Sequence, residues 1–280
     1  MERFIPRQYF SHLLAQRKKR TILRSVLLGF LMSACSHGIL ALSIELYKKG
    51  ASTPVVVSFL LASPWANLPI TFLLFRFFGV KALFILFGAL AVAFTTGVAF
   101  QFLERRGMVE SNPNTVAVEP GFSMLRDTAR RVRGYRWSVR QLGSDATQVL
   151  KGSFGLMRMT LWWILIGVAL SSLAAAFIPS HLFHRYMGPS FLGLTATLLL
   201  ATVLEVCSEG TAPMAFELFK QTGAFGNSFV FLMAGVVTDY TEIGLLWSNI
   251  GRRTALWLPV VSVPQVVLLG WLANHLFTAS

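Results

Sequence analysis

Seven long stretches without any Asp, Glu, Lys or Arg dominate this chain of 280 residues. They are Ser25–Ile44, Gly50–Phe75, Ala82–Leu103, Met159–His184, Tyr186–Leu204, Gln221–Thr238 and Thr254–Ser280. A helix needs about 20 apolar residues to cross the hydrocarbon of a bilayer, and nearly all seven stretches reach that length. Charged residues make up 13% of the chain, whereas soluble domains usually carry about 25%. The sequence therefore predicts an all-α, polytopic membrane protein with about seven apolar segments, in the bacterial plasma (inner) membrane.

The basic composition fits a membrane protein without invoking nucleic acid. The formal net charge is +13, and loops beside membrane helices are normally rich in Lys and Arg. The lipid bilayer is therefore the expected partner. The first 24 residues carry seven basic side chains and no early apolar region or cleavage site, so they do not resemble a secretion signal. The two cysteines, Cys35 and Cys207, both lie in apolar stretches and predict no disulfide framework.

The sequence repeats itself about 172 residues further on. Cys35-Ser36-His37-Gly38 matches Cys207-Ser208-Glu209-Gly210, and Glu45-Leu46-Tyr47-Lys48 matches Glu217-Leu218-Phe219-Lys220. Phe59-Leu60 matches Phe231-Leu232, which aligns Asn67 with Asp239. The order of these identities indicates an internal duplication.

We expect three parts: a first membrane repeat at 1–103, a linker at 104–157 and a second membrane repeat at 158–280. The motif Phe177-Ile178-Pro179 follows the apolar run Met159–Ala176, but its copy Phe4-Ile5-Pro6 stands at the start of the chain. The first repeat thus lacks its opening helix, or an apolar run of about 20 residues is encoded upstream of Met1.

The linker is rich in basic residues. With the adjoining Arg158 it holds ten of the 25 basic residues. Apolar residues recur at steps of three and four from Leu125 to Leu142, which predicts an amphipathic helix. Such a helix either lies on an anionic membrane surface or packs on the membrane segments as a soluble linker.

Charge counts bear on which segments cross the membrane. If all seven crossed, the two sides would hold 13 and 12 basic residues, against the usual concentration on the cytoplasmic side. If the segments with Cys35 and Cys207 re-enter the membrane as hairpins, the two sides hold 21 and 4 basic residues. If the segments with Asn67 and Asp239 re-enter instead, the two sides hold 20 and 5. Either alternative gives two repeats of opposite orientation, an architecture that recurs in transporters. The candidate breaks are the Cys-Ser-x-Gly turns, Ser63-Pro64 and Pro69 in the first copy, and Gly235 in the second.

Carboxylates concentrate in the second copy. Glu205, Glu209, Glu217, Asp239 and Glu242 lie in or beside its apolar runs, and an ionisable group within a membrane is a functional candidate by default. Asp239 and Glu242 are three residues apart and share a face if the segment is helical. The alternative is a buried hydrogen-bond network in which His37 is a partner of Glu209.

The cysteines add a second candidate chemistry. The pseudo-symmetry could bring Cys35 and Cys207 together, and soft thiolates suit soft metals and trivalent metalloids. Unpaired cysteine is also often simple packing. We therefore predict a solute or ion path, without a resident cofactor, lined by Cys35, Ser36, His37, Asn67, Cys207, Ser208, Glu209, Asp239 and Glu242. No Walker loop, nucleophile elbow or nucleotide fingerprint is present, so an enzyme is not expected.

At these motifs the chain resembles the ArsP-like predicted permeases, named for organoarsenical efflux. The resemblance rests on Ala34-Cys35-Ser36-His37-Gly38, Phe59-Leu60-Leu61-Ala62-Ser63-Pro64, Val206-Cys207-Ser208-Glu209-Gly210 and above all the run from Phe231 to Gly244. It implies a plasma-membrane permease that, in some members, exports trivalent organoarsenicals. Many relatives have a further cysteine where this chain has His37, so only two thiols remain here, enough for a dithiolate site.

Two other functions stay open beside export of a thiophilic solute. One is a permease for a sulfur species or small anion. The other is a non-transporting membrane subunit that anchors a partner, and a homo-oligomer is compatible with each.

The uneven charge counts predict that the linker and the N-terminus are cytoplasmic. Cysteines introduced at Ser111 and Ser144 should then resist a membrane-impermeant thiol reagent in whole cells and react after lysis. Labelling of both positions in intact cells would reverse the predicted orientation.

Overall fold

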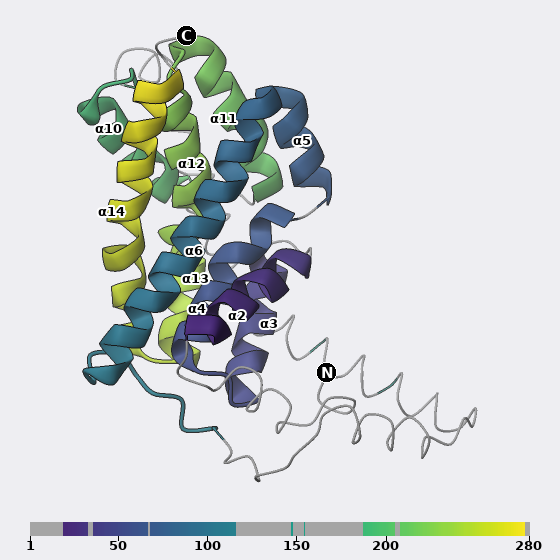
Figure 1. Cartoon of the computed structure of the whole chain (residues 1–280), viewed down its shortest axis with the longest axis vertical. Helices are drawn as coiled ribbons and strands as arrows, with labels where there is room; N and C mark the ends of the chain where they lie inside the picture. The colour runs from purple at the N-terminus through teal and green to yellow at the C-terminus, as the bar shows by residue number, and fades with distance from the viewer. Residues whose placement is uncertain are drawn as a thin grey trace.

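The computed structural model describes residues 19–32, 36–66, 68–115, 147, 154, 187–204 and 208–277. Every regular element within these ranges is helical (Figure 1), so the prediction of an all-α fold is confirmed. The expected linker helix between Leu125 and Leu142 and the apolar segment Met159–His184 lie outside the described residues.

The first half of the chain supplies α2 (Lys19–Leu31), α3 (Ser36–Lys48), α4 (Thr53–Ala62), the 3-10 helix η1 (Ser63–Ala66), α5 (Leu68–Phe78), the 3-10 helix η2 (Gly79–Lys81) and α6 (Ala82–Arg105). Local sequence explains the boundary between α3 and α4. Gly50 adopts a φ of 97°, which glycine reaches without steric cost. Pro54 then stands in the first turn of α4, where a missing N–H removes no intrahelical bond.

The second half supplies α10 (Phe191–Val203), α11 (Ser208–Thr222), α12 (Phe225–Val237), α13 (Tyr240–Asn249) and α14 (Arg252–Phe277). Gly223, with a φ of 67°, makes the turn between α11 and α12, as Gly50 does between α3 and α4. The starts of α10, α11, α12 and α13 each lie 172 residues after those of α2, α3, α4 and α5. Matching helices also have matching neighbours, because α4 packs on α2 and α6 just as α12 packs on α10 and α14.

Three helical stretches are long and apolar enough to cross a membrane, counting only the described part of the chain: Ile70–Arg105, Phe225–Asn249 and Arg252–Phe277. By contrast, α2, α3, α10 and α11 have 13 to 15 residues each, or roughly 20 Å of helix, too short for a core about 30 Å thick. In Figure 1, α2 and α3 occupy the lower half of the molecule, and α10 and α11 the upper half. This arrangement favours hairpins for the segments around Cys35 and Cys207.

The segments around Asn67 and Asp239 instead form helices that are broken midway. The pair α4 and α5 rises from the lower to the upper half, and the pair α12 and α13 descends (Figure 1). The break in the first pair falls at Ser63–Ala66, as Ser63-Pro64 predicted. The expectation of a break at Gly235 is wrong, because Gly235 lies inside α12 and the helix ends after Val237. The reason is that Asp239 can cap the next helix, whereas Gly235 offers no side chain to do so.

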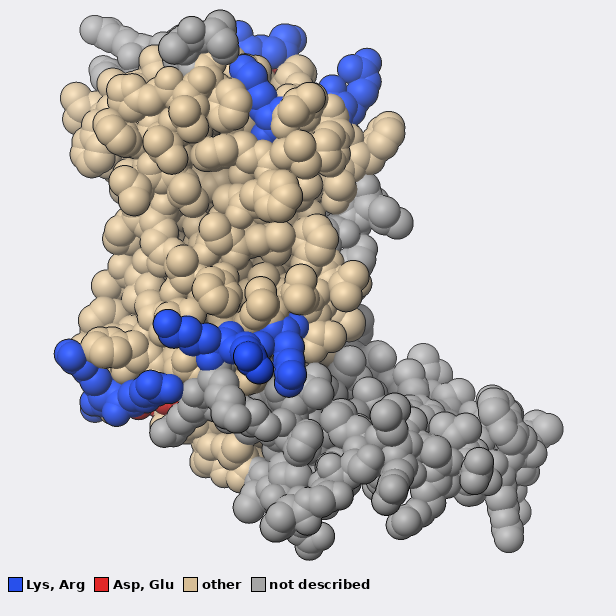
Figure 2. Space-filling view, in the orientation of Figure 1, with Lys and Arg blue, Asp and Glu red and all other residues tan. Residues whose placement is uncertain are grey.

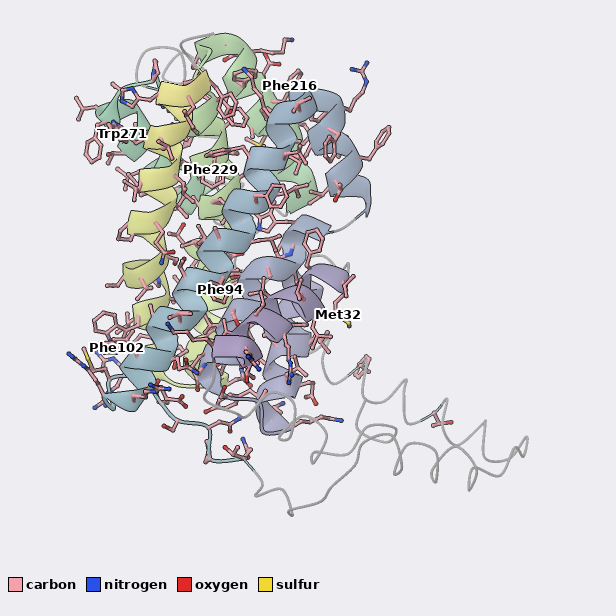
Figure 3. All side chains as sticks on the ribbon, in the orientation of Figure 1. Met32, Phe94, Phe102, Phe216, Phe229 and Trp271 are labelled. Atoms are coloured by element: carbon pink, nitrogen blue, oxygen red, sulfur yellow. The ribbon has the colours of Figure 1, made fainter. Side chains whose placement is uncertain are left out.

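Basic side chains gather at the two ends of the molecule and leave an uncharged belt between them (Figure 2). The end called here the basic end carries exposed charges at the start of α2, the end of α6 and the start of α14: Lys19, Arg20, Arg24, Arg105, Arg106, Arg252 and Arg253. Side chains such as Phe102 and Trp271 point outward from α6 and α14 (Figure 3) and are about half exposed. This surface suits lipid tails bounded by two polar interfaces.

The opposite end is held by aromatic packing between the two halves. Phe77 of α5 stacks on Phe216 of α11 at 4.7 Å between ring centroids. The contacts continue through Phe78, Phe219 and Phe225. We call this set, which also includes Phe84, Phe229 and Phe277, the phenylalanine cluster.

Glycine allows α12 and α14 to approach closely. A Cβ on Gly226 would overlap the carbonyl oxygen of Gly270, and a Cβ on Gly270 would overlap the side chain of Val230. Small residues at such crossings are typical of membrane helices, whose association depends on close packing.

We predict that Gly226→Ala destabilises the protein by about 1–3 kcal/mol, the usual cost of overpacking a close contact. Thermal unfolding in detergent, followed by size-exclusion chromatography with fluorescence detection, measures the loss. Gly188→Ala is the matched control, because a Cβ there meets open space. Equal melting temperatures for the two variants would contradict the proposed crossing.

Candidate functional site

The break in the second crossing helix is built around Asp239. This residue is the N-cap of α13, and its Oδ1 accepts hydrogen bonds from the backbone N–H groups of Thr241 at 2.7 Å and Glu242 at 3.2 Å. A helix that starts inside a membrane leaves N–H groups that water cannot satisfy. The carboxylate satisfies two of them and also lies at the positive end of the helix dipole. Asp239 therefore makes an interior helix start stable.

Polar side chains continue on both sides of this break. Thr238, the last residue before Asp239, shares a hydrogen bond of 2.8 Å with Thr202 of α10. Thr241 and Glu242, in the first turn of α13, are buried, with Glu242 only 1% exposed. The junction of α10, α12 and α13 thus holds a buried polar cluster containing two carboxyl groups.

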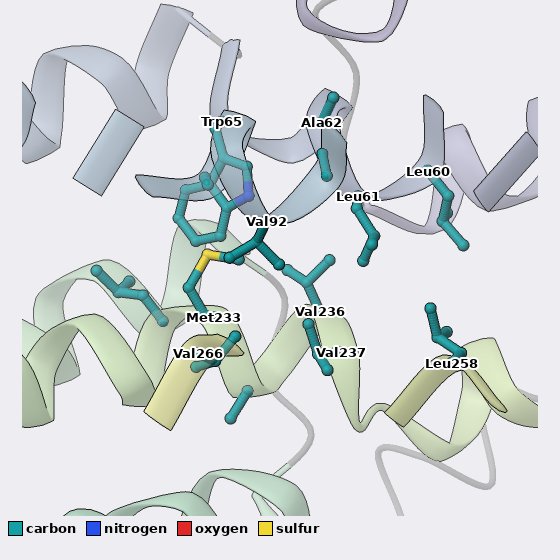
Figure 4. Close-up of a cluster of buried hydrophobic side chains, with 14 of the residues drawn as sticks. Leu60, Leu61, Ala62, Trp65, Val92, Met233, Val236, Val237, Leu258 and Val266 are labelled. Atoms are coloured by element: carbon teal, nitrogen blue, oxygen red, sulfur yellow. The ribbon is translucent and has the colours of Figure 1, made fainter. Parts of the chain in front are cut away.

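The break in the first crossing helix faces the end of α12. Trp65 of η1 is buried beside Val92 of α6 and Met233 of α12, and Val236 and Val237 lie next to them (Figure 4). The backbone oxygen of Trp65 accepts from the hydroxyl of Thr71 in α5 at 3.2 Å. Among the described residues, buried apolar side chains therefore pack between the first break and the end of α12.

The structure places the predicted site residues unevenly. Cys35, Asn67 and Cys207 lie outside the described residues. Ser36 and His37 begin α3, and Ser208 and Glu209 begin α11, but only their backbone is described. Asp239 and Glu242 are buried at the second break.

Helix packing joins elements of the two halves. The first-half helix α3 packs beside α13, and the second-half helix α11 packs beside α5. These four helices begin at Ser36, Leu68, Ser208 and Tyr240. The starts lie in the two Cys-Ser-x-Gly motifs or directly after the interruptions of the two crossing helices. Helix N-termini carry partial positive charge, and in the second half acidic residues stand in the first turns of both α11 and α13.

No cluster of three or more His, Cys, Asp or Glu side chains able to hold a metal ion occurs within the described ranges. Asp239 and Glu242 are the only predicted site residues whose side chains those ranges include.

Sequence reasoning missed a second buried polar network, at the end opposite the basic end. Asn227 donates to the backbone oxygens of Met187 and Gly188, each at 3.0 Å, and accepts from Asn274 at 2.8 Å. Asn274 in turn accepts from the N–H of Gly226 at 2.7 Å. Asparagine within an apolar run was the available signal, because polar side chains facing a helix bundle commonly join its helices.

Comparison with known proteins found a matching family model and distant relatives. A family model described as a predicted permease, of the ArsP type, matches residues 1–275. The "UPF0718 protein YcgR" of Bacillus subtilis is 21% identical over 276 residues, which covers 96% of this chain and 86% of that protein. The "Putative two-component membrane permease complex subunit" of Streptococcus mutans is 20% identical over 236 residues, covering 83% and 73%. No solved structure matches the chain significantly.

The cap at Asp239 predicts different outcomes for two substitutions. Asp239→Ala should lower the free energy of unfolding by about 0.5–2 kcal/mol, because it removes the acceptor for two buried N–H groups. Asp239→Asn should be nearly neutral, since asparagine caps about as well as aspartate. Thermal unfolding of both purified variants is the measurement. If Ala and Asn are equally stable, the carboxylate does not hold the start of α13.

Proposed function

Because the chain belongs to the ArsP family of predicted permeases, we propose that it moves a small solute across the bacterial plasma membrane through a site between its two halves. The observation that carries the proposal is the buried break at Asp239. Interrupted helices that meet at membrane depth form the substrate sites of many transporters. Irregular backbone survives there only where protein or a water-filled cavity covers it.

The two halves have the features of inverted repeats. The spacing of 172 residues between matching helices supports a duplication. In Figure 1, α6 descends from the upper end to the basic end, whereas its counterpart α14 ascends. Alternating access in such proteins is a rocking of one repeat against the other around a central site. The basic end then faces the cytoplasm, since Lys and Arg concentrate on that side.

Asp239 would link proton binding to the charge of the site. Its charged carboxylate holds two N–H groups of α13, and protonation weakens such charge-assisted bonds. Loading a proton would therefore weaken these bonds but keep a carbonyl oxygen as their acceptor, so the start of α13 would persist while the negative charge beside the buried Glu242 is removed. This is the behaviour expected of a residue that couples a proton to solute movement.

The residues that the two copies share support a candidate substrate class. Cys35 and Cys207 stand at equivalent sequence positions and would supply two thiolates to a trivalent organoarsenical or another thiophilic solute. A sulfur species or a small anion is the second candidate, with the thiols as weak hydrogen-bond partners. A role as a subunit that works with a partner is favoured by the name of the Streptococcus mutans relative, which describes part of a two-component complex.

Transport into proteoliposomes tests these proposals. Wild-type protein should move a trivalent organoarsenical, and Asp239→Asn should abolish proton-coupled transport while membrane insertion and stability persist. Cys35→Ser and Cys207→Ser should each impair transport of the arsenical. Glu217→Gln, which removes an exposed charge paired with Lys220, is the matched control and should transport normally.

The outcomes separate the candidates. Movement of sulfite or thiosulfate that survives both cysteine substitutions would favour the second substrate class. A lack of movement of every tested solute, with a copurifying membrane partner, would favour the subunit role.

A further inference from the structure

The basic end of the molecule is crossed by a short segment that follows α6. Within this segment, residues 107–115, which we call the strap, Glu110 binds the start of α14. Its Oε1 accepts from the N–H of Arg253 at 2.9 Å, and its Oε2 accepts from the N–H and the hydroxyl of Thr254, each at 2.8 Å. The Arg253 side chain also donates to the backbone oxygen of Gly107 at 3.0 Å. The strap is thus attached to the second half of the protein.

The same segment binds the turn between α3 and α4. Asn112 donates to the backbone oxygens of Tyr47 and Ala51, both at 2.6 Å. The hydroxyl of Thr53, at the start of α4, donates to the backbone oxygen of Glu110 at 2.6 Å. These atoms belong to the first half, so the strap joins the two halves at one end.

The fit around Glu110 is close. A Cβ on Gly251 would overlap its carboxyl group, so only glycine leaves room there. Partial burial works to raise the pKa of Glu110, but hydrogen bonds from Thr254 and from the N–H groups of Arg253 and Thr254 outweigh it and lower the pKa below the usual value. A lowered pKa means that the stabilisation is present above the unfolded-state pKa and is lost only as the pH falls through the folded-state pKa. At neutral pH the bonds therefore persist, and acidification within the physiological range does not release them.

We propose that the strap is a latch that keeps the basic side of the solute path closed, with Glu110 as the group that is released when this side opens. The inference rests on the proposed transport function. The helix α3 runs from the predicted site residues Ser36 and His37 to the turn that Asn112 holds. It also packs beside α13, which starts at the break capped by Asp239. Fixing the α3–α4 turn to α14 therefore prevents the hairpin from separating from the second half.

The latch is a local polar device, unlike the closure at the other end. There the two halves meet through the phenylalanine cluster, whose separation would expose apolar rings. Freeing the strap exchanges a few hydrogen bonds to water and exposes Val109 and Asn112, which are buried, a smaller apolar loss than separating the phenylalanine cluster. Loss of Glu110 should therefore open one side selectively.

Hydrogen exchange on the full chain in lipid nanodiscs tests the latch directly. Glu110→Gln should raise amide exchange at least tenfold in residues 46–56 and 252–256, with no change in α12. Glu217→Gln, the same substitution on an exposed ion pair elsewhere, should leave these segments unchanged. Unchanged exchange in Glu110→Gln would overturn the proposal. If that variant does not fold, Asn112→Ala, which removes only the contacts to the α3–α4 turn, takes its place with the same expected result for residues 46–56.

A second measurement distinguishes a latch that closes the solute path from a contact that only stabilises the fold. The rate at which a membrane-impermeant maleimide, added from the basic side, modifies Cys35 and Cys207 should rise several-fold in Glu110→Gln and in Asn112→Ala. Faster exchange without faster modification would show that the strap does not gate the path, and would overturn the proposal. Neither readout needs a substrate, so a wild-type protein that transports nothing would refute the proposed function and leave the latch to be judged by these two results.

Discussion

The requirement that every backbone N–H at membrane depth find a partner inside the protein shapes this fold. Two crossing helices are interrupted midway, and each new helix start exposes N–H groups where no bulk water reaches. In the second half the carboxylate of Asp239 meets that requirement for α13. In the first half Asn67, another residue type that caps helices well, precedes α5 in the sequence. Both copies therefore have, directly before the new helix, a residue type that caps helices well, and the differences between the copies lie in charge.

The two halves are therefore similar in the arrangement of their helices but differ in where charged side chains stand. The first turns of α11 and α13 contain Glu209 and Glu242, whereas the matching positions in the first half are His37 and Ile70. Acidic groups at helix N-termini compensate the positive end of the dipole. The second half therefore carries the ionisable groups, and the first half offers helix starts without acids. A central site between such halves would present two chemically different walls to a solute.

Much of the architecture could be predicted from sequence because it is encoded in local patterns. The apolar stretches, the repeat spacing and the break at Ser63-Pro64 are visible in single segments of chain. The segment Asp239-Tyr240-Thr241-Glu242 also contains a recognisable signal, an N-cap residue followed three positions later by Glu. We instead interpreted the two acids as one face of a helix and did not predict the cap. Other features could not be predicted. The contacts of Glu110 with Thr254 and of Asn227 with Asn274 join residues 144 and 47 positions apart, and no local pattern determines such pairings.

The two ends of the molecule are closed by interactions of different kinds, and this bears on how the halves could move. Hydrogen bonds at a water interface are exchanged for bonds to water at small net cost, so the exposed and part-buried contacts of Glu110 can break one at a time. Aromatic rings gain from removal of apolar area and from ring geometry, and several of them must separate together. The basic end should therefore open by stepwise release of a thin connection, whereas the opposite end should open as a unit. A rocking motion built from these two closures is asymmetric even though the helices that carry them are related by duplication.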